Sequence, residues 1–210
     1  MKTVYRYIIL FFIVILAGPF VALTIKASIG VAAWDAFNQT NAGLFNTKIG
    51  TMVFLTNSIC VLIQILIYKK EFRKIQLLQL LVSFIMGMLI NLSFYNIFTF
   101  EFSVYYQRFI TFILSTVAVA FLVGAIMSLD IISFPLEGMC KAISDKSNFS
   151  FVKLRFGFDI FGILVALTVP LFTGQTVAIR EGTIIGMLLF SPLLGFFMPI
   201  QKQFIEKYLK

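Results

Sequence analysis

The sequence contains no histidine, only two cysteines and few charged residues. Charged residues make up 12% of the 210 residues, whereas a soluble globular domain usually carries about 25%. Without histidine the chain lacks the commonest metal ligand and the commonest acid–base side chain. Cys60 and Cys140 form no CxxC pair, and we interpret each as a small apolar packing residue. No metal and no other cofactor is expected.

Apolar residues predominate in the sequence. They make up 60% of the chain and include 26 phenylalanines, which predicts an all-α integral membrane protein whose first partner is the lipid bilayer. The net charge of +8 is interpreted as basic residues flanking membrane segments rather than as a nucleic-acid surface. Because the chain has no GxSxG, HExxH or P-loop sequence, we do not expect an enzyme.

Uncharged runs predict the transmembrane helices. Six of them approach the ~20 residues that a helix needs to cross hydrocarbon: Tyr7–Ile25, Ile49–Tyr68, Ile75–Phe100, Phe109–Leu129, Ile160–Ile179 and Gly182–Gln201. The first run resembles a signal peptide, but it continues to Ile25 and is interpreted as a membrane helix.

Basic residues are unevenly distributed between the segments that join these runs. With the N-terminus in the cytoplasm, all but four of the 17 lysines and arginines fall on the cytoplasmic side. The four exceptions are Lys26, Lys48, Arg108 and Arg180. This positive-inside bias predicts a multi-pass protein of the cytoplasmic membrane with both termini in the cytoplasm.

The two halves of the sequence are similar. "LAGPFVALTIKASIGVAAWDAF" matches "FLVGAIMSLDIISFPLEGMCKAI", with Gly18 on Gly124 and, after a gap of four, Asp35 on Glu137; "IMGMLINLS" matches "IIGMLLFSP". We interpret residues 1–105 and 106–210 as two three-helix repeats of one membrane domain. Because three is odd, the second repeat is inverted, as in many secondary transporters with a site at the repeat interface.

An acid follows the first and the fourth span. Trp34–Asp35 and Glu137 each begin a short amphipathic stretch that we expect to be helical, Asp35–Leu44 and Glu137–Asp145. One interpretation is a carboxylate that complements the helix dipole, with Trp34 as an interfacial anchor. The alternative is a pair of half-helices that converge from opposite faces and line a polar cavity.

Two further sequences supply candidate site residues. In "VKLRFGFD", Arg155 and Asp159 are four apart and share a helix face, where they can neutralise each other. An acid that begins an apolar span is costly unless it is paired or faces water. In "REGTIIG", Arg180–Glu181 is expected to be a solvated pair, and Gly182–Thr183 allows close backbone approach.

These motifs resemble a known family. "SIGVAAWDAF", Lys48-Ile49-Gly50, "PLEGM", "KLRFGFD" and "GTIIGMLLFSP" are similar to sequences of the YitT/YczE-type bacterial membrane proteins, over most of the chain. The resemblance implies a small protein of the cytoplasmic membrane.

Three functions fit these observations. The first is a transporter of a small solute or ion, whose substrate-binding residues would be Trp34, Asp35, Glu137, Arg155, Asp159 and Thr183. The second is the substrate-binding subunit of a vitamin importer that works with a separate ATPase module. The third is a membrane scaffold that regulates another enzyme. A homodimer is compatible with each.

Overall fold

The computed structural model describes residues 2–209, of which none is in a strand, and 82% of the structure is helix. Within this range six helices are long and apolar enough to cross a membrane, which confirms an all-helical chain with six candidate spans. They are α1 (Lys2–Lys26), α3 (Ile49–Tyr68), α4 (Leu78–Leu92), α5 (Tyr105–Ser128), α7 (Phe151–Thr173) and α8 (Glu181–Leu209). Two shorter helices are α2 (Ala33–Leu44) and α6 (Pro135–Lys146).

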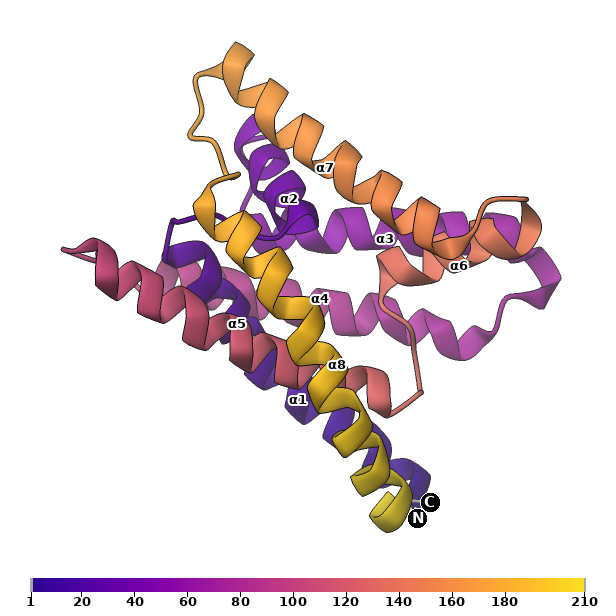
Figure 1. The fold of residues 1–210 in the computed structure, drawn as a ribbon. Helices are drawn as coiled ribbons and strands as arrows, with labels where there is room; N and C mark the ends of the chain where they lie inside the picture. The colour runs from indigo at the N-terminus through magenta and orange to yellow at the C-terminus, as the bar shows by residue number, and fades with distance from the viewer. Residues whose placement is uncertain (1, 210) are drawn as a thin grey trace.

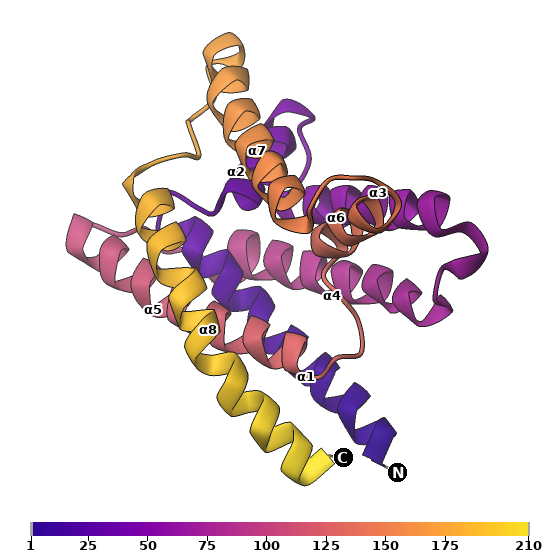
Figure 2. The same cartoon turned by 45° about the vertical axis from the view of Figure 1, so that its right-hand side comes forward.

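The ends of the long helices gather on two opposite sides of the molecule (Figure 1). Both ends of the chain lie together at the lower right, and the turn that joins α3 to α4 lies at the right. Consistent with this, Arg6 near the start of α1 donates a hydrogen bond to the carbonyl of Leu129 after α5. A second view shows α7 and α8 diverging from the linker that joins them (Figure 2).

The fifth span differs from its predicted position. It covers Phe151–Thr173 and so begins nine residues before the predicted Ile160. Ser150 caps the helix, because its side chain accepts a hydrogen bond from the backbone N–H of Lys153. The helix ends at Gly174, which has the left-handed φ of 68° that favours glycine. The prediction bounded each span by charged residues. It misplaced this span because its charged residues lie within the helix.

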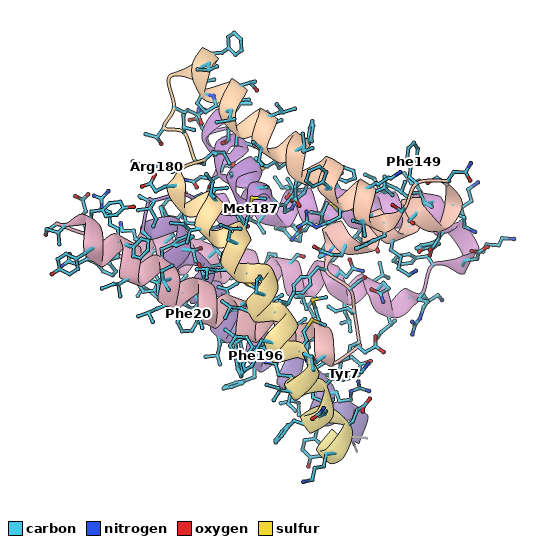
Figure 3. The ribbon with its side chains drawn as sticks, viewed as in Figure 1. Tyr7, Phe20, Phe149, Arg180, Met187 and Phe196 are labelled. Carbon is cyan, nitrogen blue, oxygen red and sulfur yellow. The ribbon has the colours of Figure 1, made fainter. Side chains whose placement is uncertain are left out.

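Large apolar side chains cover the outside of the long helices. On α8, which Figure 3 labels at Met187 and Phe196, these two side chains are 49% and 63% exposed. A soluble protein rarely exposes large contiguous patches of apolar side chains. The exposed faces of these helices therefore suit contact with lipid.

The two short helices and the spans that follow them share one spacing. Ala33–Leu44 and Pro135–Lys146 differ by 102 residues at both ends. The spans Ile49–Glu71 and Phe151–Thr173 also differ by 102 at both ends. Ser28 and Asp130, again 102 apart, both have positive φ, 55° and 51°. This spacing sets Asp35 opposite Glu137 without the gap of four, and it sets Gly18 opposite Ala120 rather than Gly124.

Each short helix packs against the long helices of both halves. In α2, Asn38 accepts a hydrogen bond from Thr56 of α3 at 2.6 Å, and the carbonyl of Ala33 lies against Gly162 of α7. In α6, the carbonyl of Pro135 accepts a hydrogen bond from Gln64 of α3 at 3.1 Å. Because α6 also contacts α7, the two short helices lie between α3 and α7.

A second core joins α1, α4 and α5. Its buried residues include Leu10 and Val14 of α1, Val82 of α4, and Leu122 and Ile126 of α5. Leu10 and Val14 are fully buried. This core fixes α1 against α5, and α8 packs on the other side of α5.

Two long helices approach each other closely at Gly50 of α3 and Gly87 of α4. A Cβ atom on either glycine would overlap the carbonyl oxygen of the other. Across the same contact, the N–H of Gly50 donates to the side chain of Asn91 at 2.8 Å. Helices that approach this closely need a residue without a side chain.

We therefore expect Gly87→Ala to destabilise the protein by about 1–3 kcal/mol, because the added methyl group must push α3 and α4 apart. Gly195→Ala is the matched control, since no atom lies within 4 Å of the added carbon. It should be neutral or stabilise α8 by up to about 1 kcal/mol. Thermal unfolding of both variants in detergent measures the difference, and equal unfolding temperatures would contradict the close packing.

Candidate functional site

The site is built at the N-terminal ends of α2 and α6. Neither helix has a side chain that caps its first backbone N–H groups, and α6 begins with Pro135 in its first turn. Each helix carries one acid in that turn, Asp35 in α2 and Glu137 in α6. The uncapped N–H groups and the helix dipole favour negative charge at both positions.

Arg155 of α7 forms ion pairs with one acid of α6 and one acid of its own helix. Its Nε donates to Glu137 of α6 at 3.1 Å, and its Nη1 donates to Asp159 one turn further along α7. The three side chains are 27–32% exposed, so water screens them only in part. The i,i+4 pair of Arg155 and Asp159 is confirmed, whereas the pairing with Glu137 was not foreseen.

Asp35 also lies in the electric field of Arg155 but is not directly paired with it. No hydrogen bond or ion pair to its carboxylate is described within residues 2–209. Burial raises the pKa of Asp35 to about 6, and the positive charge of Arg155 partly opposes that rise. Three carboxyl groups therefore share one guanidinium, and Asp35 is the one without a direct partner.

Trp34 packs between the helices. Its ring stacks on Phe37 at a centroid distance of 4.8 Å and contacts the buried cluster that contains Cys60 of α3 and Met139 of α6. Its indole Nε1 is buried without a hydrogen-bond partner. These contacts place Trp34 against the interior of the protein.

Thr183, the last predicted site residue, lies apart from the acids. Its hydroxyl donates to the carbonyl of Val31 at 2.8 Å, and the N–H of Gly182 donates to the carbonyl of Ile29 at 2.6 Å. The close backbone approach at Gly182 is thus confirmed, but it fastens the start of α8 to the linker between α1 and α2. The neighbouring Arg180–Glu181 pair is open to solvent, with its charged atoms 3.9 Å apart. The described contacts do not join Thr183 to the acids.

Sequence reasoning missed two buried polar side chains beside the site, Asn38 and Gln79. Asn38, one turn after Asp35, is 1% exposed and bonds to Thr56. Gln79 is fully buried and exchanges hydrogen bonds with Gln64 at 3.1 and 3.2 Å. Polarity within an apolar run was the available signal for Gln79.

Two cavities flank the short helices. The α6 cavity, about 290 Å³, is lined by Gln64, Tyr68, Glu71, Phe72, Arg73, Gln76, Ser133, Gly138 and Lys141. The α2 cavity, about 270 Å³, is lined by Gln39, Thr40, Ala42, Gly43, Thr47, Ile49, Tyr95, Gln175 and Thr176. Gln39 and Lys141 are 102 residues apart, so the constant spacing sets one opposite the other. Neither cavity is lined by Asp35, Glu137, Arg155 or Asp159.

The cysteines add no second kind of chemistry. Both thiols are free and buried, and burial raises the pKa of Cys140 to about 11, so this thiol stays neutral near pH 7. Between residues 2 and 209 no group of three or more Cys, Asp and Glu side chains could hold a metal ion.

Comparison with known proteins identifies the chain at the level of a family. Residues 4–199 match a family of unknown function, DUF6198, and the chain belongs to that family. No curated protein and no solved structure matches the chain.

The raised pKa of Asp35 predicts a pH-dependent stability. An acid whose pKa is higher in the folded than in the unfolded state stabilises the fold while it is protonated, and that contribution is lost as pH rises through the folded pKa. We therefore expect Asp35→Asn to gain unfolding temperature relative to the wild type as pH rises from 5 to 8. The wild-type emission of Trp34, the only tryptophan, should change with a midpoint near pH 6. A midpoint near 4, or one that persists in Asp35→Asn, would contradict this assignment.

Removal of the guanidinium should raise the pKa of Asp35 further. In Arg155→Gln the three carboxyl groups lose their only described counter-charge, so the Trp34 midpoint is expected above pH 6 and the protein should lose about 2–3 kcal/mol of stability. Lys153→Gln removes an exposed charge from the same helix and serves as the control. A midpoint that moves equally in both variants would show that net charge, rather than the position of Arg155, sets the pKa.

Proposed function

We propose that this member of the DUF6198 family carries a small solute across a membrane through a polar site between α2 and α6. The observation that carries the proposal is the pairing of Arg155 with Glu137 and Asp159, within the field of Asp35. Charged side chains on membrane helices are rare, and they mark substrate or ion pathways and proton relays.

An inverted 3+3 repeat is part of the proposal. Residues 1–105 and 106–210 each contain three long helices and one short helix after the first of them. The constant spacing of 102 residues and the matching positive φ of Ser28 and Asp130 support a duplication. If each half begins on the opposite side of the bilayer, α2 and α6 are half-helices with N-termini that face each other near the midplane.

The proposed chemistry follows from the charges. With every group ionised, the carboxylates of Asp35, Glu137 and Asp159 exceed Arg155 by two negative charges. A low-dielectric site compensates such an excess by taking up a proton or a cation. Asp35 is the proposed acceptor because it lacks a direct partner, while Arg155 holds the other two acids and Trp34 forms one wall.

The proposed location is the cytoplasmic membrane, with both termini in the cytoplasm. The unequal distribution of basic residues supports this orientation. The described turn between α3 and α4, which carries Lys69, Lys70, Arg73 and Lys74, lies on the same side of the molecule as the chain ends (Figure 1). The resemblance to YitT/YczE-type proteins agrees with this location.

Transport is tested in proteoliposomes with an acidic exterior and radiolabelled glycerol, ribose, glucose, alanine and choline as probes. We expect uptake of at least one probe to depend on the proton gradient and to fall at least tenfold in Asp35→Asn, which removes the proposed proton acceptor. The same loss is expected in Glu137→Gln and Asp159→Asn, because each removes a carboxylate that pairs with Arg155. Glu101→Gln, in an exposed loop, is the control. Uptake that none of the three substitutions reduces would contradict the site.

A further inference from the structure

Most contacts between helices have a counterpart in the other half of the chain. α1 packs on α4 as α5 packs on α8, and α2 packs on α7 as α6 packs on α3. The starts of α4 and α8 match in the same way. In α8, the hydroxyl of Thr183 donates to the carbonyl of Val31 in the linker before α2. In α4, the amide of Gln79 donates to the hydroxyl of Ser133 in the linker before α6 at 3.4 Å.

The packing of α3 along α4 lacks such a counterpart. Within residues 2–209, no comparable packing joins α7 to α8, and these two helices diverge from the linker that connects them (Figure 2). Of the most apolar stretches of α3 and α4, 39% and 33% of the residues are buried, against 17% and 6% for α7 and α8. The second half is therefore open where the first half is closed.

Gly50, Phe54 and Asn57 form one face of α3 that contacts α4. Gly50 lies at the close backbone approach described above. The centroid of the Phe54 ring lies 5.5 Å from that of Phe84, and the amide of Asn57 donates to the hydroxyl of Ser83 at 3.3 Å. This face combines a close approach, an aromatic contact and a polar contact, so it specifies how α3 and α4 pack.

The spacing of 102 residues sets three residues of α7 opposite this face. They are Val152, Phe156 and Asp159. Val152 and Phe156 are 73% and 62% exposed, whereas Gly50 of α3 is buried. The face of α7 that corresponds to the packed face of α3 is thus uncovered, and it carries one acid of the charged cluster.

We propose that the protein has a second conformation in which α7 packs along α8, as α3 packs along α4 here, while α3 and α4 separate. We assign α8 as the partner of the uncovered face because it holds the place of α4 in the second half and is joined to α7 through residues 174–180. Two halves built from the same helices can exchange their arrangements at a small difference in free energy.

The exchange changes the side from which the charged cluster is reached. Closure of α7 onto α8 covers Asp159, because this acid lies on the face that α8 contacts. Separation of α3 from α4 uncovers the equivalent residue of the first half, Asn57. The inference rests on the inverted repeat of the proposed function, and it supplies the alternating access that a site between two inverted repeats requires.

The test measures distances between spin labels by double electron–electron resonance in lipid nanodiscs. Asn148→Cys with Gln203→Cys reports on the diverging ends of α7 and α8, and Phe45→Cys with Asn96→Cys reports on α3 and α4. All four positions are exposed, whereas both native cysteines are buried and should not be labelled. We expect a second, shorter α7–α8 distance, populated to the same extent as a second, longer α3–α4 distance.

Gly87→Ala should shift these populations. Its methyl group weakens the α3–α4 contact and leaves α7 and α8 unchanged, so the ratio of the second conformation to the first should rise about fivefold or more. Gly138→Ala is the matched control. Its methyl group meets the side chain of Gln64 where α6 packs on α3, a contact that has a counterpart and is kept in both conformations. It should leave the ratio unchanged.

The inference is overturned if each pair gives one distance in the wild type and in Gly87→Ala alike, or if Gly138→Ala shifts the ratio equally. It is also overturned if singly labelled Phe156→Cys chains lie close to each other, because a second copy then covers the face of α7. Two conformations without solute uptake in proteoliposomes would reject the proposed function and keep the inference. Uptake with a single conformation would do the reverse.

Discussion

The pairing of Arg155 with Glu137 and Asp159 is the interaction on which the centre of the molecule depends. It joins α6 to α7 and brings three partly buried charged groups together. Removing one charge from such a site leaves the others without compensation, and the cost of an uncompensated charge rises as water is excluded. The arrangement of α2 and α6 between α3 and α7 therefore follows from electrostatics as well as from apolar packing.

The polar groups of the chain are divided into three regions along the short helices. The charged cluster lies at the two helix N-termini, the α2 cavity at the far end of α2, and the α6 cavity beside α6. The α2 cavity is lined by neutral groups, whereas Glu71, Arg73 and Lys141 line the α6 cavity.

Local patterns in the sequence were sufficient to predict the helices and part of the site. Uncharged runs indicated the candidate spans, and amphipathic spacing indicated the short helices with Asp35 and Glu137 in their first turns. Contacts between distant segments could not be predicted, because they depend on how the helices pack. The bond from Arg155 to Glu137 crosses a turn, and Thr183 bonds to Val31, 152 residues away, instead of joining the acids.

The packing of each short helix on a long helix from the other half has a consequence for biogenesis. When residues 1–105 have left the ribosome, α2 has α3 beside it but still lacks α7. Asp35 then faces lipid, headgroups or a chaperone until synthesis reaches residue 173. The first half can thus be inserted early, but its polar helix finds its final position only when the second half arrives.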